Sequence, residues 1–295
     1  MKSKFTTALL LAIASGSAYA DMTFTVTFTA QAMSDLSAAE QALFTDGLAM
    51  WDAVIDDHRD GSGISWNLNV DTFSSPSSGG GITLGSAGPS GLAFSGVVGD
   101  SHTSDGRFIV STGGNASFNV HPDAGPLQAA VIAHEIGHAL GIGTLWEDNE
   151  VYNDGVGGNH NRTLAGGVAG QYVGPAALAA FQTEFDAAAT FIPVERDGGP
   201  GTANGHWNEV EDNFGSENEL GFDSDPGDGG PAPSSADGSL DDELMTGVLS
   251  GSAFLSDTTI AQLHDIGFSL ETVPEPSSSA LLAIASVGFI LRRRK

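Results

Sequence analysis

The chain has 295 residues, no cysteine and a formal net charge of −27, from 37 acidic and 10 basic residues. Phosphate backbones are bound by clustered lysine and arginine side chains, so this balance argues against nucleic acid as a partner. Without cysteine there are no disulfides, and stability must come from a hydrophobic core. Strong acidity of this kind suits a soluble protein in cation-rich surroundings outside the cell.

The first 20 residues have the order of a secretory signal peptide. Two lysines lie within the first four positions, an apolar stretch follows at 8–14, and small residues end the segment at Ala18-Tyr19-Ala20. The apolar run is much shorter than the roughly 20 residues that a membrane-spanning helix needs. We therefore expect an exported protein whose mature chain begins at Asp21.

The mature chain opens with a strand and a helix. Residues 22–30 alternate between apolar and threonine side chains, which predicts a half-buried strand. Ser37 and Glu40 form a capping-box pattern, and apolar residues at helical spacing follow as far as Ile55. This pattern predicts a helix of about five turns.

The remaining elements are sparser and complete an α+β order. Apolar patterns predict strands at 64–70, 108–111 and 118–120, and helices at 127–140, 175–189 and 257–266. The glycine-rich stretch 74–91 predicts no element. Residues 211–242 are acidic, rich in glycine, proline and serine, and poor in apolar groups, so we expect an inserted loop there.

The helix expected at 127–140 carries the sequence His134-Glu135-Ile136-Gly137-His138. Histidines four residues apart lie about 40° apart around a helix and about 6 Å apart along it, which suits two ligands of one metal ion. Zinc prefers imidazole nitrogen, and catalytic zinc sites use three protein ligands. Glu135 points in another direction, from which it can reach a water molecule beside the metal. Simple packing is a poor alternative, because buried imidazoles and a carboxylate are costly without partners.

The third ligand is not close in the sequence. In the commonest metzincins it follows the helix-ending glycine, here Gly141, by three residues, and that position is Thr144. The candidates elsewhere are His206, His121, His160 and His264. A gluzincin-type arrangement would instead take an oxygen ligand from Glu184.

Four segments together resemble the leishmanolysin-like branch of the metzincin peptidases. They are HEIGHALGIGTLW at 134–146, IPVERDGGPGTANGHW at 192–207, DELMTG at 242–247 and TTIAQLHDIGF at 258–268. The resemblance implies that His206 is the third zinc ligand and that Met245 forms a turn beneath the metal without binding it. It also implies a metzincin-like α+β fold with two lobes around an active-site cleft.

Calcium is a second cofactor to consider. Asp223, Asp225 and Asp228 lie in FDSDPGDGG, but Gly227 occupies a position where an EF-hand loop supplies a ligand. A solvated loop is the favoured interpretation of these residues.

The C-terminal residues resemble a PEP-CTERM sorting signal. Val273-Pro274-Glu275-Pro276 precedes an apolar run at 280–291 and the basic end 292–295. The resemblance implies transient membrane contact, processing by an exosortase-type enzyme, and release or surface display by a Gram-negative bacterium. A single C-terminal anchor with cytoplasmic arginines is the alternative. Without both terminal segments, four arginines and 36 acidic residues remain, a net charge of −32.

These observations predict a secreted or surface-associated zinc endopeptidase. His134, His138 and His206 would bind zinc, Glu135 would be the general base, and proteins or peptides would be the substrates. A non-catalytic matrix or adhesion protein that keeps the peptidase fold is the alternative function. The expected boundaries are a signal peptide at 1–20, a metallopeptidase domain at 21–272 with lobes 21–143 and 144–272, the insertion 211–242, and the sorting signal 273–295.

Overall fold

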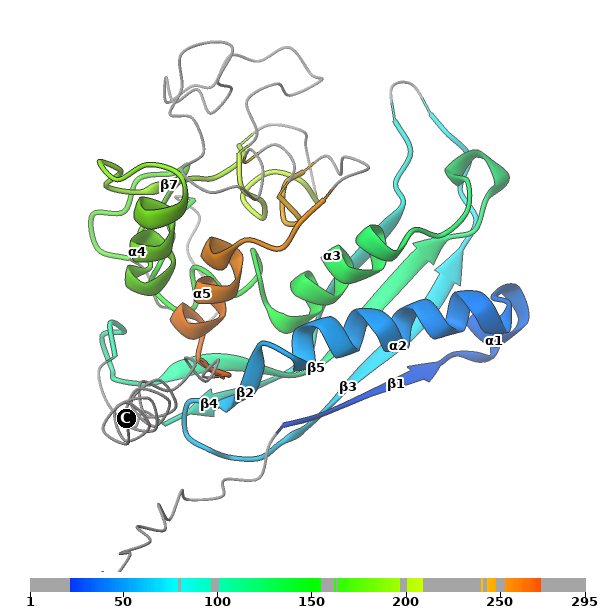
Figure 1. Cartoon of the computed structure of the whole chain (residues 1–295), viewed down its shortest axis with the longest axis horizontal. Helices are drawn as coiled ribbons and strands as arrows, with labels where there is room; N and C mark the ends of the chain where they lie inside the picture. Colours follow the sequence, from blue (N-terminus) through cyan, green and yellow to red (C-terminus); the bar gives the residue numbers. More distant parts are fainter. Residues whose placement is uncertain are drawn as a thin grey trace, which may run out of the picture.

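The chain forms a small mixed β-sheet with several helices, as a computed structural model shows (Figure 1). The structure describes residues 22–78, 81–96, 101–154, 162, 164–196, 201–208, 240, 243–247 and 253–271. The elements, in chain order, are β1 (Thr23–Phe28), α1 (Ala30–Asp35), α2 (Ala38–Asp52), β2 (Ile55–His58), β3 (Ser65–Phe73), β4 (Gly85–Ser95), β5 (Phe108–Asn119), a 3-10 turn (Pro122–Ala124), α3 (Ala129–Leu140), β6 (Gln171–Tyr172), α4 (Pro175–Glu184), β7 (Ile192–Pro193), α5 (Asp257–Asp265) and β8 (Phe268–Leu270).

The main sheet has the strand order β1-β3-β5-β4. The first three strands are parallel, and β4 pairs antiparallel with β5 at the edge of the sheet. Helices α1, α2 and α3 lie on one face (Figure 1). Trp66, Leu68 and Val70 of β3 are fully buried toward these helices. The other face carries polar side chains such as Asn67 and Asn69, which alternate with the buried residues as a half-buried sheet requires.

The first predicted strand and helix are confirmed as β1 and α2. The Ser37–Glu40 capping box is formed in both directions. The strands expected at 108–111 and 118–120 are wrong as separate elements, because they are two ends of the continuous strand β5. Gly114 interrupts the apolar pattern there for a packing reason. A Cβ atom on Gly114 would lie 2.5 Å from the Cβ of Ala139 in α3.

Seven short or glycine-rich elements were not predicted, namely α1, β2, β4, the 3-10 turn, β6, β7 and β8. Helix α1 and strand β2 are only six and four residues long. Strand β4 lies partly inside the glycine-rich stretch 74–91, where glycine, alanine, serine and proline give no apolar alternation. The sheet edge is therefore formed by small residues, whose sequence pattern does not predict a strand.

Helices α4 and α5 are antiparallel, and the acidic end of each caps the start of the other. The Glu184 carboxylate accepts hydrogen bonds from the backbone of Asp257 and Thr258, at 3.3 and 3.0 Å. The Asp265 carboxylate accepts from the backbone of Ala176 and Ala177, both at 2.9 Å. These bonds satisfy N–H groups that a helix start leaves unpaired.

Helix α4 ends five residues before the predicted end at 189. The side chain of Asp186 accepts a hydrogen bond from the backbone N–H of Ala188, at 2.9 Å, and so forms a turn instead of a further helical residue. The predicted helix at 257–266 is confirmed as α5, which ends at Asp265 and is followed by Gly267 with a φ of +100°.

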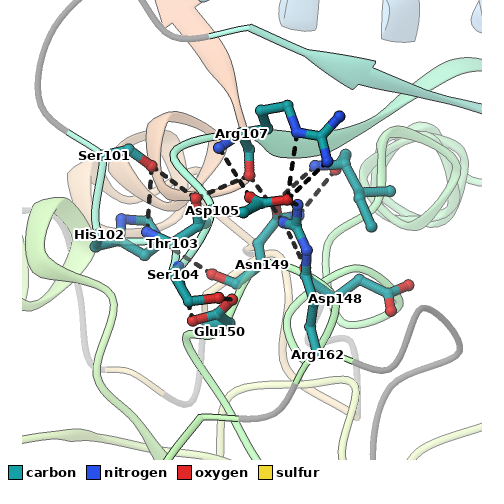
Figure 2. A network of polar contacts seen from close by, with 11 residues as sticks. Ser101, His102, Thr103, Ser104, Asp105, Arg107, Asp148, Asn149, Glu150 and Arg162 are labelled. Atoms are coloured by element: carbon teal, nitrogen blue, oxygen red, sulfur yellow. Dashed lines mark hydrogen bonds and ion pairs between the residues drawn. The ribbon is translucent and has the colours of Figure 1, made fainter.

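Two arrangements join distant parts of the chain. Strand β2 pairs with β8, so the last described strand lies beside the first third of the sequence. Figure 2 shows the second arrangement, in which the Arg162 guanidinium binds both carboxylate oxygens of Asp105, at 2.6 and 2.7 Å. In the same network the side chain of Asn149 pairs with both backbone groups of Ile109. Segments on either side of residue 143 are therefore tied together.

Several predicted segments lie outside the described residues, namely the signal peptide 1–20, most of the insertion 211–242 and the sorting signal 273–295. Among the described helices, none has both the length and the apolar character to cross a membrane.

Candidate metal centre

Helix α3 presents His134 and His138 one turn apart. It begins at Ala129, two residues later than predicted, because the backbone of Gln128 is extended, with a φ of −108° and a ψ of 140°. It ends at Gly141, whose φ of +119° is a conformation that glycine adopts without strain. Most of the helix is buried, and its two histidines are buried (His134) and partly buried (His138).

The structure brings His206 to these two histidines. The Nε2 atom of His138 lies 3.0 Å from Nε2 of His134 and 2.9 Å from Nε2 of His206, and the third separation is 3.1 Å. Two nitrogens bound to one zinc ion at about 2.0–2.1 Å are at most about 4.2 Å apart. Within the described residues this is the one group of three or more side chains that could hold a metal ion.

The other nitrogen of each ring faces a backbone carbonyl. Nδ1 of His134 lies 2.7 Å from the Leu244 oxygen, Nδ1 of His138 lies 3.0 Å from the Ile142 oxygen, and Nδ1 of His206 lies 2.7 Å from the Thr202 oxygen. A carbonyl only accepts, so each Nδ1 carries the proton. Each Nε2 therefore has a lone pair directed at the common point, as in metal-binding histidines.

Burial keeps these imidazoles neutral. Desolvation lowers the pKa of His134 and His138, and it lowers the pKa of His206 to about 3. Neutral imidazole is the form that binds a metal ion. Three such nitrogens suit zinc, copper, iron or nickel better than calcium or magnesium. The residues present therefore fit a transition-metal ion.

Glu135 is buried beside the histidines, and burial raises its pKa to about 8. Its carboxyl group lies against the start of β4, because a Cβ atom on Gly85 would be only 2.7 Å from Oε1 of Glu135. The absence of a side chain at Gly85 thus leaves room for the carboxyl group between α3 and the edge strand.

Met245 packs against α3 between the two histidines. The methionine is fully buried, and a Cβ atom on Gly137 would lie 2.7 Å from its sulfur. A second close approach brings in His206, since a Cβ atom on Gly143 would lie 2.5 Å from the carbonyl oxygen of Gly205. Glycine at these two positions lets both C-terminal segments reach the helix.

The other candidates for a third ligand are placed elsewhere, as far as the structure describes them. His121 caps the 3-10 turn by accepting from the backbone of Asp123. His264 lies in the last turn of α5, and Glu184 binds the start of that helix. His160 and the aspartates considered for calcium, Asp223, Asp225 and Asp228, lie outside the described residues.

Sequence reasoning could not find the carbonyl groups that orient the rings. Leu244, Ile142 and Thr202 contribute backbone oxygens, and backbone oxygens leave no signal in the residue type. The same holds for the buried carboxylate of Glu243, which becomes informative only once its hydrogen bonds are known.

Comparison with known proteins informs the C-terminal end. Residues 272–295 match the family model described as the PEP-CTERM protein-sorting motif. The chain carries this sorting motif. The motif implies export, processing by an exosortase and cell-surface sorting in a Gram-negative bacterium. No curated protein matches the chain, so the main body has no family assignment from this comparison.

Proposed function

We propose that the protein is an exported zinc endopeptidase of the leishmanolysin-like metzincin type. His134, His138 and His206 would hold the zinc ion, and Glu135 would be the general base. The observation that carries the proposal is the convergence of three Nε2 atoms at 2.9–3.1 Å, with each Nδ1 bound to a backbone carbonyl. The neutral state of the histidines and the position of Met245 support it.

Bound zinc supplies Lewis-acid chemistry, because it polarises a carbonyl group and makes a water molecule more acidic. The residues of this chain would carry out the proton transfer. Glu135 would take the proton of the attacking water and deliver it to the leaving amine of the peptide. Glu135 is the residue after His134 in α3, and its side chain is buried.

The edge strand β4 supports a peptide as the substrate. Among the described residues its second side has no neighbour in the main sheet, and an extended peptide can add there as a further strand through backbone hydrogen bonds. Gly85 at the start of β4 touches Glu135, so a peptide on this edge would pass the general base. Small residues in the first half of β4 leave space for it.

The domain boundaries belong to the same proposal. Residues 1–20 would be removed on export, and 21–272 would form the peptidase with lobes 21–143 and 144–272. Substrate would bind between helix α3 and the segments that carry His206 and Met245.

The experiment is hydrolysis of casein by the full-length protein, wild type beside Glu135→Ala, at equal zinc content. We expect activity in the wild type and a loss of about 10²–10⁴-fold in the variant, the usual contribution of a general base. Equal cleavage by both proteins would exclude Glu135 from the reaction.

A second function is favoured by the surface-sorting motif, which suits a displayed matrix or adhesion protein that keeps the metal site without catalysis. In that case both proteins would bind zinc and neither would cleave casein, a result that would replace the peptidase proposal.

A further inference from the structure

Glu243 is a fully buried carboxylate two residues before Met245. Its Oε2 accepts from the backbone N–H of Met245 at 2.5 Å, and its Oε1 accepts from the backbone and hydroxyl groups of Ser256 at 3.2 and 2.9 Å. A buried carboxylate is costly unless such bonds satisfy it. These bonds converge on one group that joins the turn 243–246 to the start of α5.

The first connection leads to His134. The bond to Met245 N–H fixes the turn 243–246, which is closed further by the Thr246 hydroxyl on the Glu243 carbonyl at 2.9 Å. The carbonyl of Leu244 inside this turn accepts the Nδ1 proton of His134 at 2.7 Å. The Glu243 side chain therefore holds the group that orients the first histidine.

The second connection leads to His206. The Ser256 hydroxyl, which donates to Glu243, accepts from the backbone N–H of Thr259 at 3.0 Å, and the Thr259 hydroxyl accepts from the indole N–H of Trp207 at 2.8 Å. The backbone N–H of Trp207 also donates to the Met245 carbonyl at 3.0 Å. Because Trp207 follows His206 directly, the same carboxylate fixes the segment that carries the third histidine.

We propose that Glu243 is a positioning residue of the metal centre, which holds His134 through the Leu244 carbonyl and His206 through Thr259 and Trp207. The inference deepens the proposed function and rests on the three histidines binding a metal ion. Removing the carboxylate should loosen two of the three ligands, and the metal affinity should fall.

Glu184 provides a matched control. It is also buried, and it accepts from the backbone and hydroxyl groups of Thr258 at 3.0 and 2.9 Å, one residue from Thr259. In the described part of the chain these bonds come from α5, which carries none of the three histidines. The two carboxylates thus share burial, chemistry and helix, and they differ in the connection to the metal centre.

The experiment is titration of the metal-free full-length protein with Co²⁺, measured by the visible spectrum of bound cobalt and by competition with a chelator. In Glu243→Gln the amide nitrogen must face the N–H of Met245 or of Ser256, so one hydrogen bond is lost. We expect the Kd for Co²⁺ to rise about 10–100-fold, as is usual for groups that orient a ligand, with a changed spectrum. Glu184→Gln should lower the melting temperature and leave the spectrum and Kd as in the wild type.

A second pair of variants is gentler on the fold. Thr259→Val should weaken Co²⁺ binding, Thr259→Ser should restore it by returning the hydroxyl, and Thr258→Val should leave it unchanged. If Glu243→Gln does not fold, these variants decide, and equal Kd values for Thr259→Val and Thr258→Val would overturn the proposal.

Two further outcomes would overturn it. Folded Glu243→Gln with the wild-type Kd and spectrum would show that the ligands keep their positions without the carboxylate. Equal losses in Glu243→Gln and Glu184→Gln would assign the effect to general stability. If the wild type itself binds no Co²⁺, the metal centre and both proposals fail together, whereas wild-type binding with unaffected variants removes the positioning role alone.

Discussion

Gly137 decides how closely the turn 243–246 can approach helix α3. A Cβ atom there would lie 2.7 Å from the sulfur of Met245 and 3.1 Å from the Trp51 ring. Both neighbours are fully buried, so neither can move aside freely.

We therefore predict that Gly137→Ala lowers the free energy of unfolding by about 1–3 kcal/mol, the usual cost of overpacking a core. Urea denaturation would measure it. Gly88→Ala is the control, because a Cβ atom on Gly88 would meet nothing within 4 Å. Similar losses in the two variants would contradict the packing argument.

The sequence predicts the proximity of residues that lie on the same helix. His134 and His138 lie on one side of α3 because their spacing matches the helical turn, so their proximity follows from local structure alone. The approach of His206 depends on the contact between Gly143 and Gly205, which are distant in the sequence. Only the resemblance to a known family singled out His206 among the candidate histidines, since no local pattern encodes that contact.

Among the elements, the joint between α4 and α5 is sensitive to pH. The Asp265 carboxylate caps α4 and also accepts from the Tyr172 hydroxyl at 3.1 Å. Burial raises the pKa of Asp265 to about 6. Between the ordinary aspartate pKa and this value, the folded protein binds a proton that the unfolded chain does not. The contribution of Asp265 to stability is therefore largest in acid and is lost as the pH rises through about 6.

We predict that the stability difference between wild type and Asp265→Asn depends on pH. As the pH falls from about 6 to about 4, the wild type should gain relative to the variant, by up to about 1.4 kcal/mol per pH unit. Chemical denaturation of both proteins across this range would measure the difference. Parallel curves would show that Asp265 does not titrate in this window.

Prediction of the elements depended on how clearly each one separates apolar from polar residues. Helix α2 and strand β3 have one buried and one exposed side, and their patterns are clear. Strand β4 is built from small residues at the sheet edge, and β5 contains Gly113-Gly114 where α3 comes close, so both patterns are broken. The small residues in these two strands are required by packing between elements. The apolar pattern of one segment carries no information about such packing.

At the scale of the whole molecule, a bound metal ion would join α3 to the segment 201–208. An ion that binds only the folded protein stabilises it by about 2.7 kcal/mol at a concentration 100 times its Kd. We predict that a chelator lowers the melting temperature of the wild type and leaves that of His206→Ala unchanged, because the variant lacks one ligand. His264→Ala should respond like the wild type. Identical responses of the wild type and His206→Ala would contradict the three-histidine site.

The pairing of β2 with β8 has a consequence for biosynthesis. The hydroxyl of Ser269 bonds to the Asp57 carbonyl across 212 positions of sequence, and the backbone N–H of Glu271 bonds to Val54. Strand β2 therefore cannot pair with β8 until almost the whole chain has been synthesised. The sorting motif begins at 272, directly after this closing strand. A chain truncated before β8 lacks both the final strand and the sorting motif. Only chains that contain the residues of the complete fold can therefore be sorted to the cell surface.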